Sequence, residues 1–357
     1  MKYLAVWIGA LLLSAAEISL SHAAENTAPM FNVLQFNVWH EGTQVSNGLE
    51  KICDVIVASK VDVVCFSEVR NYKQEDWTTK VVEMLKKKGQ TFYGKYAGGD
   101  VGLVSKFPIT ESIPVFDQSK GDSGSIIAWR LAVDEKRSAI VASAHLDYKE
   151  YGMNLIRGYN GGTPDWKIRD ANADGVPDPI TNVEEILAYN NKSSRIPAIK
   201  AFIEKAKTWD VPVILCGDFN EDSHLDWTAA TKDAFDHHGV VIEWPCTKLL
   251  ADAGFLDAWR EVHPDPLKQP GATWPAVAAG KGPTSWTPKA DERDRIDFVF
   301  GKGLKAHAAW LVGPVELYVR NQPAAAVDKE LVHHADLPWP SDHKAVLAEY
   351  EWIDLKK

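Results

Sequence analysis

The sequence lacks an excess of basic residues. It carries 39 Lys and Arg against 49 Asp and Glu, and its formal net charge is −10. Most nucleic-acid binders present a basic patch to the phosphate backbone, and this composition does not predict one. An acidic composition is nevertheless compatible with a nuclease, because a carboxylate-rich metal site makes a chain acidic and the bound cations reverse the local field.

Cysteines and long apolar runs are also scarce. The chain has four cysteines in 357 residues, and Cys65 and Cys216 lie in apolar runs typical of buried strands, where a free thiol behaves as a small hydrophobe. Beyond the first residues, no stretch reaches the roughly 20 apolar residues that a membrane-spanning helix needs. There is no repeat and no linker-like change of composition, so we expect one folded domain.

The first residues have the pattern of a secretory signal peptide. Lys2 precedes an apolar run from residue 4 to residue 16, and Ser21-His22-Ala23 forms a small-residue cleavage site. The alternative, a membrane anchor, is disfavoured because Glu17 interrupts the run. We therefore expect a signal peptide at 1–23, cleavage near Ala23, a mature chain of residues 24–357 and a secreted or periplasmic location.

Short apolar runs alternate with helix-like segments along the mature chain. The runs predict buried strands at 31–36, 61–66, 102–105, 139–144, 211–215 and 296–300, and the segments predict helices at 47–59, 76–88 and 194–208. Hairpin-length and helix-length connections together favour a mixed, layered α/β fold. Two irregular stretches, 148–193 and 263–293, are long enough to be walls of a substrate cleft.

Polar residues recur where the predicted strands end. Strand ends present reactive groups on a rigid scaffold, because a carboxylate within the strand would be buried and unpaired. Any single residue of this kind could equally be a turn or a helix cap. The set comprises Asn37, Glu68, His145, Asp218 and Asn220 after apolar runs, Asp297 within one, and Asp342 and His343 just before the last.

The motifs around these residues occur in a specific order. Gly217-Asp218-Phe219-Asn220 and Ser341-Asp342-His343 are the most specific, and Ser67-Glu68-Val69 and Arg295-Ile296-Asp297 support them. From about residue 31 to residue 350 the chain resembles the endonuclease/exonuclease/phosphatase superfamily with its deoxyribonuclease-I-like fold. The resemblance implies a four-layer α/β sandwich, in which two packed mixed β-sheets are flanked by helices and the site lies at one edge.

The chemistry of these residues also fits phosphoester hydrolysis. That reaction needs the negative charge on the phosphate oxygens to be neutralised, and it needs a polarised water in line with the leaving group. We expect Mg²⁺ (or Mn²⁺) to be bound by Glu68 with Asn37 as its neutral neighbour, and Asp342 to complete a second cation position or bind water.

The remaining residues of the set have expected roles in proton transfer and phosphate binding. Asp218 and Asn220 would orient the attacking water and the phosphate. His145 would donate a hydrogen bond to a non-bridging oxygen. His343, held by Asp297, would act as general base. We expect these five residues to be catalytic.

A second cation site is predicted in the stretch 148–193. Oxygen-bearing side chains and a carbonyl follow the spacing of a calcium loop with Gly175 at the turn, and the segment resembles the calcium loops of thrombospondin type 3 repeats. The acid of an EF-hand is missing at its twelfth position, where Thr181 stands, and the alternative is an Asp/Asn-rich turn without an ion. The predicted ligands of this structural Ca²⁺ are Asp170, Asn172, Asp174, Val176 and Asp178.

The substrate is the least determined feature of the sequence. Arg70, Tyr72, Arg157 and Trp286 are candidates to clamp a phosphate or stack on a ring. We expect a phosphodiester or phosphomonoester of a small molecule or lipid headgroup, hydrolysed by a monomer without stable membrane insertion. The alternatives are a secreted nuclease and a non-catalytic calcium-dependent binding module.

Overall fold

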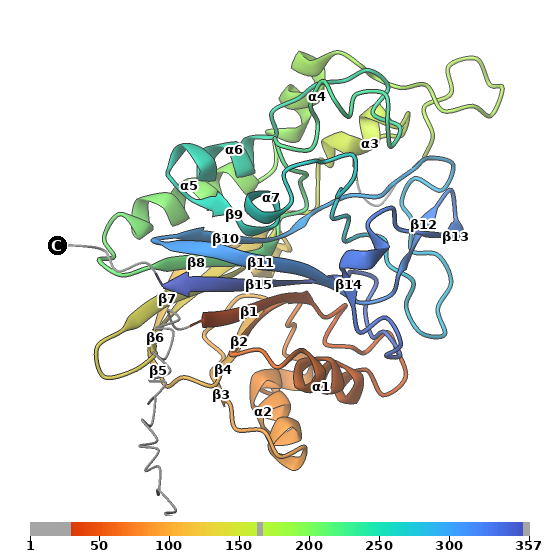
Figure 1. Ribbon diagram of the computed structural model, residues 1–357. Coiled ribbons are helices and arrows are strands. Elements are labelled where there is room, and N and C mark those ends of the chain that lie inside the picture. The colour runs from red at the N-terminus through yellow and green to blue at the C-terminus, as the bar shows by residue number, and fades with distance from the viewer. Residues whose placement is uncertain (1–29, 163–166, 353–357) are drawn as a thin grey trace, which may run out of the picture.

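The computed structural model describes residues 30–162 and 167–352, so the predicted signal peptide lies outside the described residues. Two mixed β-sheets form the centre of the molecule (Figure 1). The first sheet has the order β14 (Val332–His333), β11 (Leu304–Val312), β15 (Ala345–Trp352), β1 (Met30–Asn37), β2 (Val63–Ser67), β4 (Val101–Ser105), β3 (Tyr93–Gly94). The second has the order β5 (Ile109–Asp117), β6 (Gly124–Ala132), β7 (Ser138–Leu146), β8 (Val213–Asp218), β10 (Asp297–Lys302), β9 (Leu256–Asp257).

Helices cover the outer face of each sheet. Below the first sheet lie α1 (Gly48–Ser59) and α2 (Trp77–Lys87); above the second lie α5 (Arg195–Ala206) and α6 (Pro245–Asp252) (Figure 1). Shorter elements are α3 (Gly152–Ile156), α4 (Val183–Asn190), α7 (Ala258–Val262) and the hairpin of β12 (Glu316–Val319) with β13 (Gln322–Ala325). Single turns of 3₁₀-helix lie at Tyr72–Gln74, Ser119–Gly121 and Lys329–Leu331. The predicted four-layer sandwich is confirmed.

Three apolar cores separate the four layers. Val33, Cys65 and Cys216 belong to the core between the two sheets. The outer cores lie between α1, α2 and the first sheet, and between α5, α6 and the second. Because the central strands are covered on both faces, their sequences are continuous apolar runs rather than alternating ones, as in β2, which is buried throughout. This pattern made them recognisable in the sequence.

Strand direction brings the predicted site together. β1 pairs parallel with β2, so both end at the same edge of the first sheet. β7 pairs parallel with β8, and β10 runs antiparallel to β8 with Asp297 opposite Asp218. The stretch 148–193, expected to be irregular, contains α3 and α4 and lies above this edge (Figure 1). No helix among the described residues is long and apolar enough to cross a membrane.

The buried side chain of His237 is expected to make the stability of the fold depend on pH. The ring of His237 stacks on Trp227 with 3.6 Å between centroids. Burial, with the charge of Arg157, lowers the pKa of His237 to about 3. The unfolded chain takes up a proton near pH 6.5 and the folded chain does not, so this histidine destabilises the fold as pH falls from about 6.5 towards 3.

We predict that wild type loses about 2 kcal/mol more unfolding free energy between pH 7.5 and pH 5 than a His237→Phe variant, which keeps the stacked ring and removes the titration. Urea denaturation of both proteins at the two pH values measures the difference. Equal losses would show that His237 does not resist protonation.

Candidate active site

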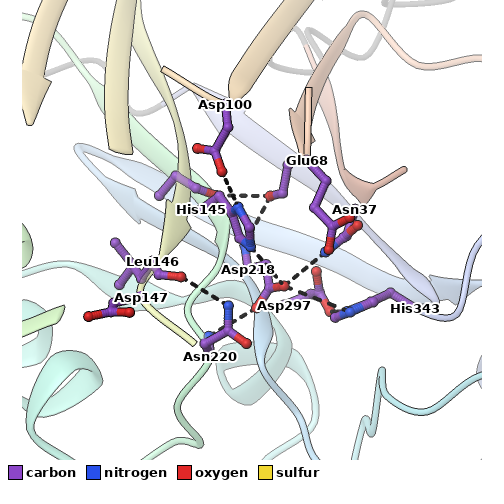
Figure 2. A network of polar contacts seen from close by, with 12 residues as sticks. Asn37, Glu68, Asp100, His145, Leu146, Asp147, Asp218, Asn220, Asp297 and His343 are labelled. Carbon is purple, nitrogen blue, oxygen red and sulfur yellow. Dashed lines mark hydrogen bonds and ion pairs between the residues drawn. The ribbon is translucent and has the colours of Figure 1, made fainter. Parts of the chain in front are cut away.

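The predicted catalytic and metal-binding residues meet at the edge where the two sheets end. Asn37 is the last residue of β1 and Glu68 follows β2 directly. From the second sheet come His145 near the end of β7 and Asp218 at the end of β8. Figure 2 shows their side chains pointing toward one another, with Asp218 in the middle. Residues that stand at separate strand ends in the sequence therefore lie together in the structure.

Asp218 is the centre of this group. Its Oδ2 lies 3.9 Å from Nε2 of His145 and 3.8 Å from Nε2 of His343. The same oxygen accepts a hydrogen bond from Nδ2 of Asn37 at 2.9 Å, and Oδ1 accepts one from the Asn220 backbone amide at 2.9 Å. Two imidazoles therefore flank one carboxylate at nearly equal distances.

Each imidazole is held from behind by a second carboxylate. Nδ1 of His343 lies 2.8 Å from Oδ2 of Asp297, as predicted. Nδ1 of His145 lies 2.5 Å from Oδ2 of Asp100 in the same way. In both cases the bond at Nδ1 leaves Nε2 facing Asp218, because the two ring nitrogens point in opposite directions.

Asp100 is a site residue that the sequence did not reveal. It precedes β4 directly, and its Oδ1 accepts a hydrogen bond from Ser125 at 2.6 Å. Arg70 lies 3.4 Å from it and donates to Asp122 at 2.8 Å. The only available signal was an acidic residue next to an apolar strand. The same signal marks many turns, and the partner His145 is 45 residues away.

The carboxylates set the charge states of the site. Burial lowers the pKa of His145, but Asp100, Asp218 and Glu68 outweigh it and raise that pKa to about 9. Asp297 and Asp218 likewise outweigh burial at His343 and raise its pKa to about 10. Burial, with Asp297, raises the pKa of Asp218 to about 6 against the lowering effect of both histidines. The carboxylates thus favour the protonated form of both imidazoles, whereas burial disfavours the ionised form of Asp218.

Comparison with known proteins identifies the family. A model of the Endonuclease/Exonuclease/phosphatase family matches residues 34–343. The chain belongs to this family. The uncharacterized protein F14F9.5 of Caenorhabditis elegans is 29% identical over 330 residues, which cover 92% of this chain and 93% of that protein.

Solved structures agree on the fold. An endonuclease/exonuclease/phosphatase family protein from Leptotrichia buccalis has a TM-score of 0.50 and 14% identity, over 90% of this chain and 100% of that one. TDP2 from C. elegans has a TM-score of 0.50 and 14% identity, over 92% of this chain and 78% of that one. At this identity the likeness shows the deoxyribonuclease-I-like fold alone. The family itself is hydrolytic, with nucleases and phosphatases among its members.

Members of the family generally depend on a divalent metal, and the residues of this site fit one. Oδ1 of Asp342 is buried and has no hydrogen-bond partner among residues 30–162 and 167–352. Burial, with the carboxylates of Glu68 and Asp218, raises the pKa of Asp342 to about 7 despite His343. A hard divalent cation would supply the missing positive charge and bind the open oxygen.

Glu68 and Asn37 have distinct positions in this donor set. Burial raises the pKa of Glu68, but the neighbouring His145, His40 and Arg70 lower it overall, so Glu68 is ionised. Asn37 donates from Nδ2 to Glu68 at 3.1 Å and to Asp218 at 2.9 Å, and its oxygen accepts the Trp39 amide at 2.9 Å. Asn37 therefore joins the two carboxylates, and its role as a metal ligand stays a prediction.

The site opens into a cavity of about 300 Å³. Its walls combine the catalytic residues with rings from the irregular stretches, including Trp286, and with Arg70. Trp286 packs edge-on against Tyr151, with 5.3 Å between ring centroids, and contacts Trp274 in a tilted arrangement, with 5.1 Å between ring centroids. The lining residues are Trp39, His40, Glu68, Arg70, Asp122, His145, Tyr148, Tyr151, Asp218, Asn220, Trp274, Trp286, Ile296, Asp342 and His343. Of the predicted substrate residues, Arg70 and Trp286 line the cavity, and Tyr72 lies behind His40.

The prediction that Arg157 contacts substrate is wrong. Its side chain is buried and makes a two-pronged ion pair with Asp294, which also accepts the Tyr151 hydroxyl at 2.9 Å. Asp294 precedes β10 closely, so this pair ties the stretch 148–193 to the second sheet. Surrounding Gly and Asn made the segment resemble an exposed loop, and the partner lies 137 residues away.

The predicted calcium loop is partly exposed, and hydrogen bonds from its backbone amides to its own Asp side chains organise it. Asp170 accepts hydrogen bonds from the amides of Asp174 at 3.0 Å and Gly175 at 2.8 Å. Asp178 accepts one from the amide of Ala171 at 2.6 Å. Among the described residues, Asp218, Asp297 and His343 bring three possible ligand atoms within 4.8 Å of one another, as a metal site requires. The residues of the loop do not form such a group. Calcium binding stays a prediction.

Proposed function

We propose that the protein is an exported, divalent-metal-dependent hydrolase of phosphoesters carried by a small molecule or lipid headgroup. The observation that carries this proposal is Asp218, flanked by two imidazoles whose far nitrogens are held by Asp100 and Asp297. A carboxylate between two cationic donors suits a reaction in which a water loses a proton while negative charge accumulates on phosphate oxygens.

The catalytic role of each residue follows from which of its atoms faces the cavity. Asp218 accepts the proton of the attacking water, since its Oδ2 faces the cavity between the histidines. His145 and His343 donate from Nε2 to the non-bridging oxygens, so His343 acts as a donor rather than as the general base expected from sequence. Asn220, fixed by its bond to the Leu146 carbonyl at 3.0 Å, helps to orient the phosphate. A divalent cation at Glu68 and Asp342 would neutralise the phosphate and stabilise the leaving oxygen.

The size and charge of the cavity favour a small substrate over a polynucleotide. Among the described residues that line it, Arg70 is the one arginine or lysine, and Asp100 and Asp122 already neutralise its charge. A phosphate backbone needs a longer row of cations. The nuclease alternative is supported by the family and by Trp286 and Tyr148, on which a base could stack.

A substrate panel separates these alternatives. It should contain a phosphomonoester, bis-p-nitrophenyl phosphate, sphingomyelin and plasmid DNA. Turnover of one of the first three, without nicking of the plasmid, is the expected result. Nicking at catalytic rates would establish the nuclease, and no turnover of any phosphoester with metal present would leave the non-catalytic binding module.

We predict that removal of divalent metal abolishes this activity. EDTA-treated and desalted protein should hydrolyse bis-p-nitrophenyl phosphate at least about 100-fold more slowly, because the phosphate charge is then unneutralised. Added Mg²⁺ or Mn²⁺ should restore the rate. Undiminished turnover in metal-free buffer, with the metal content checked by atomic emission, would rule out metal dependence.

Export is proposed from the sequence of residues 1–23 alone. Expression of the full chain in a secreting host should yield a mature protein whose amino-terminal sequence begins near Ala24. An intact Met1 on the soluble product would contradict export by this signal.

A further inference from the structure

Residues 38–42 form one turn of left-handed helix beside the active site. Trp39, His40 and Glu41 have φ values of 41°, 56° and 63°, and Gly42 has 74°. The Gly42 amide donates to the Val38 carbonyl at 2.5 Å, which closes the turn. Left-handed backbone is unfavourable for residues with a Cβ, and three such residues in succession are rarely found unless surrounding contacts impose it.

The contacts that impose this turn come from the active site. The Trp39 amide donates to Oδ1 of Asn37 at 2.9 Å, and the His40 amide donates to Oε2 of Glu68 at 2.8 Å. The buried carboxylate of Glu41 accepts the Asn71 amide. The strained turn and the loop after β2 therefore hold each other in place.

The turn places the side chain of His40 at the cavity. Its Nε2 lies 3.6 Å from Oε2 of Glu68, and the side chain keeps 38% of its surface exposed. Its Nδ1 lies 2.7 Å from the Tyr72 hydroxyl, and the two rings are nearly parallel. When that hydroxyl donates to Nδ1, the imidazole proton resides on Nε2, next to Glu68.

We propose that His40 is a further substrate-binding residue, which donates from Nε2 to an oxygen of the phosphoryl group bound beside Glu68, and that Tyr72 fixes its tautomer. The inference rests on the proposed phosphoester hydrolysis. The strain supports it, because a histidine without a role at the cavity needs no left-handed backbone to reach the surface.

A His40→Asn variant separates the imidazole from the turn. Asparagine tolerates left-handed backbone better than most residues, so the amide bond to Glu68 is retained while the imidazole is lost. We expect KM for the best substrate of the panel, and the inhibition constant for inorganic phosphate, each to rise about tenfold. The Mg²⁺ concentration for half-maximal activity should stay unchanged. Tyr72→Phe should raise both constants about two- to fivefold.

The controls make each outcome decisive. His307→Asn, on the exposed face of β11, should match wild type in all measurements. The inference is overturned if KM and the phosphate inhibition constant of His40→Asn equal those of wild type. It is also overturned if only the Mg²⁺ concentration for half-maximal activity rises, because the segment would then serve only to hold Glu68. If His40→Asn does not fold, as judged by circular dichroism, phosphate inhibition of Tyr72→Phe decides, and a wild-type value there overturns the inference.

The proposed function fails separately. Wild type that neither hydrolyses the panel nor binds inorganic phosphate with Mg²⁺ present, as followed by ³¹P line broadening, would overturn both proposals. Wild type that does both, with an unaltered His40→Asn variant, would overturn only the role of His40.

Discussion

An Asp218→Asn variant is expected to hydrolyse phosphoesters about 10³-fold more slowly than wild type while being at least as stable. The substitution removes the group that we propose accepts the proton of water, together with the charge that both imidazoles face, and groups of this kind contribute roughly 10²- to 10⁴-fold. Stability should not suffer, because burial and Asp297 raise the pKa of Asp218 to about 6, which shows that the folded protein disfavours this charge.

The combination of lost activity and retained stability identifies a catalytic residue. The rate with saturating Mg²⁺ and the midpoint of thermal unfolding should be measured on the same preparation. The matched control is Asp252→Asn, which should change neither quantity. Asp252 is an exposed residue of α6, and the ion pair that it makes among the described residues is with Lys248. A fully active Asp218→Asn enzyme would remove Asp218 from the mechanism, and a severely destabilised one would make its role structural.

The second large effect concerns stability. Arg157→Met is expected to lower the unfolding free energy by about 3–5 kcal/mol, because it leaves the buried carboxylate of Asp294 without its counter-ion. KM of the residual folded enzyme should stay within about twofold of wild type, because Arg157 does not line the cavity. Guanidinium denaturation and steady-state kinetics measure the two quantities.

The double variant Arg157→Met/Asp294→Asn tests the cause. Asn at 294 keeps an acceptor for the Tyr151 hydroxyl but carries no charge, so the double variant should be more stable than Arg157→Met alone. A double variant less stable by the sum of both single losses would show that packing, and not the unpaired charge, causes the effect. An increased KM at unchanged stability would restore Arg157 to the substrate site.

Local sequence was sufficient for six of the strands and for most of the site, but β5, β6, β11 and β15 were not predicted. β1 and β2 were predicted to within two residues because strands covered on both faces require continuous apolar runs. Asn37, Glu68 and Asp218 were found because each stands at a strand end, where a rigid scaffold can expose a polar group. Both signals are contained in a few consecutive residues, so no knowledge of the partners was needed.

Partners across the fold could not be predicted in this way. Asp100 reaches His145 only because β4 and β7 come together through the packing of the two sheets, and Arg157 finds Asp294 only after the stretch 148–193 folds over β10. The left-handed turn at Trp39 also depends on the site, since propensity alone disfavours it and the side chains of Asn37 and Glu68 hold it.

The sequence by itself thus determined the layered α/β fold and the residues around Asp218, because apolar runs and strand-end motifs are local properties of the chain. Only the tertiary structure decided that Asp100 holds His145, that Arg157 is structural and that His40 faces the cavity. Those properties depend on distances between segments far apart in sequence, which are set when the two sheets pack.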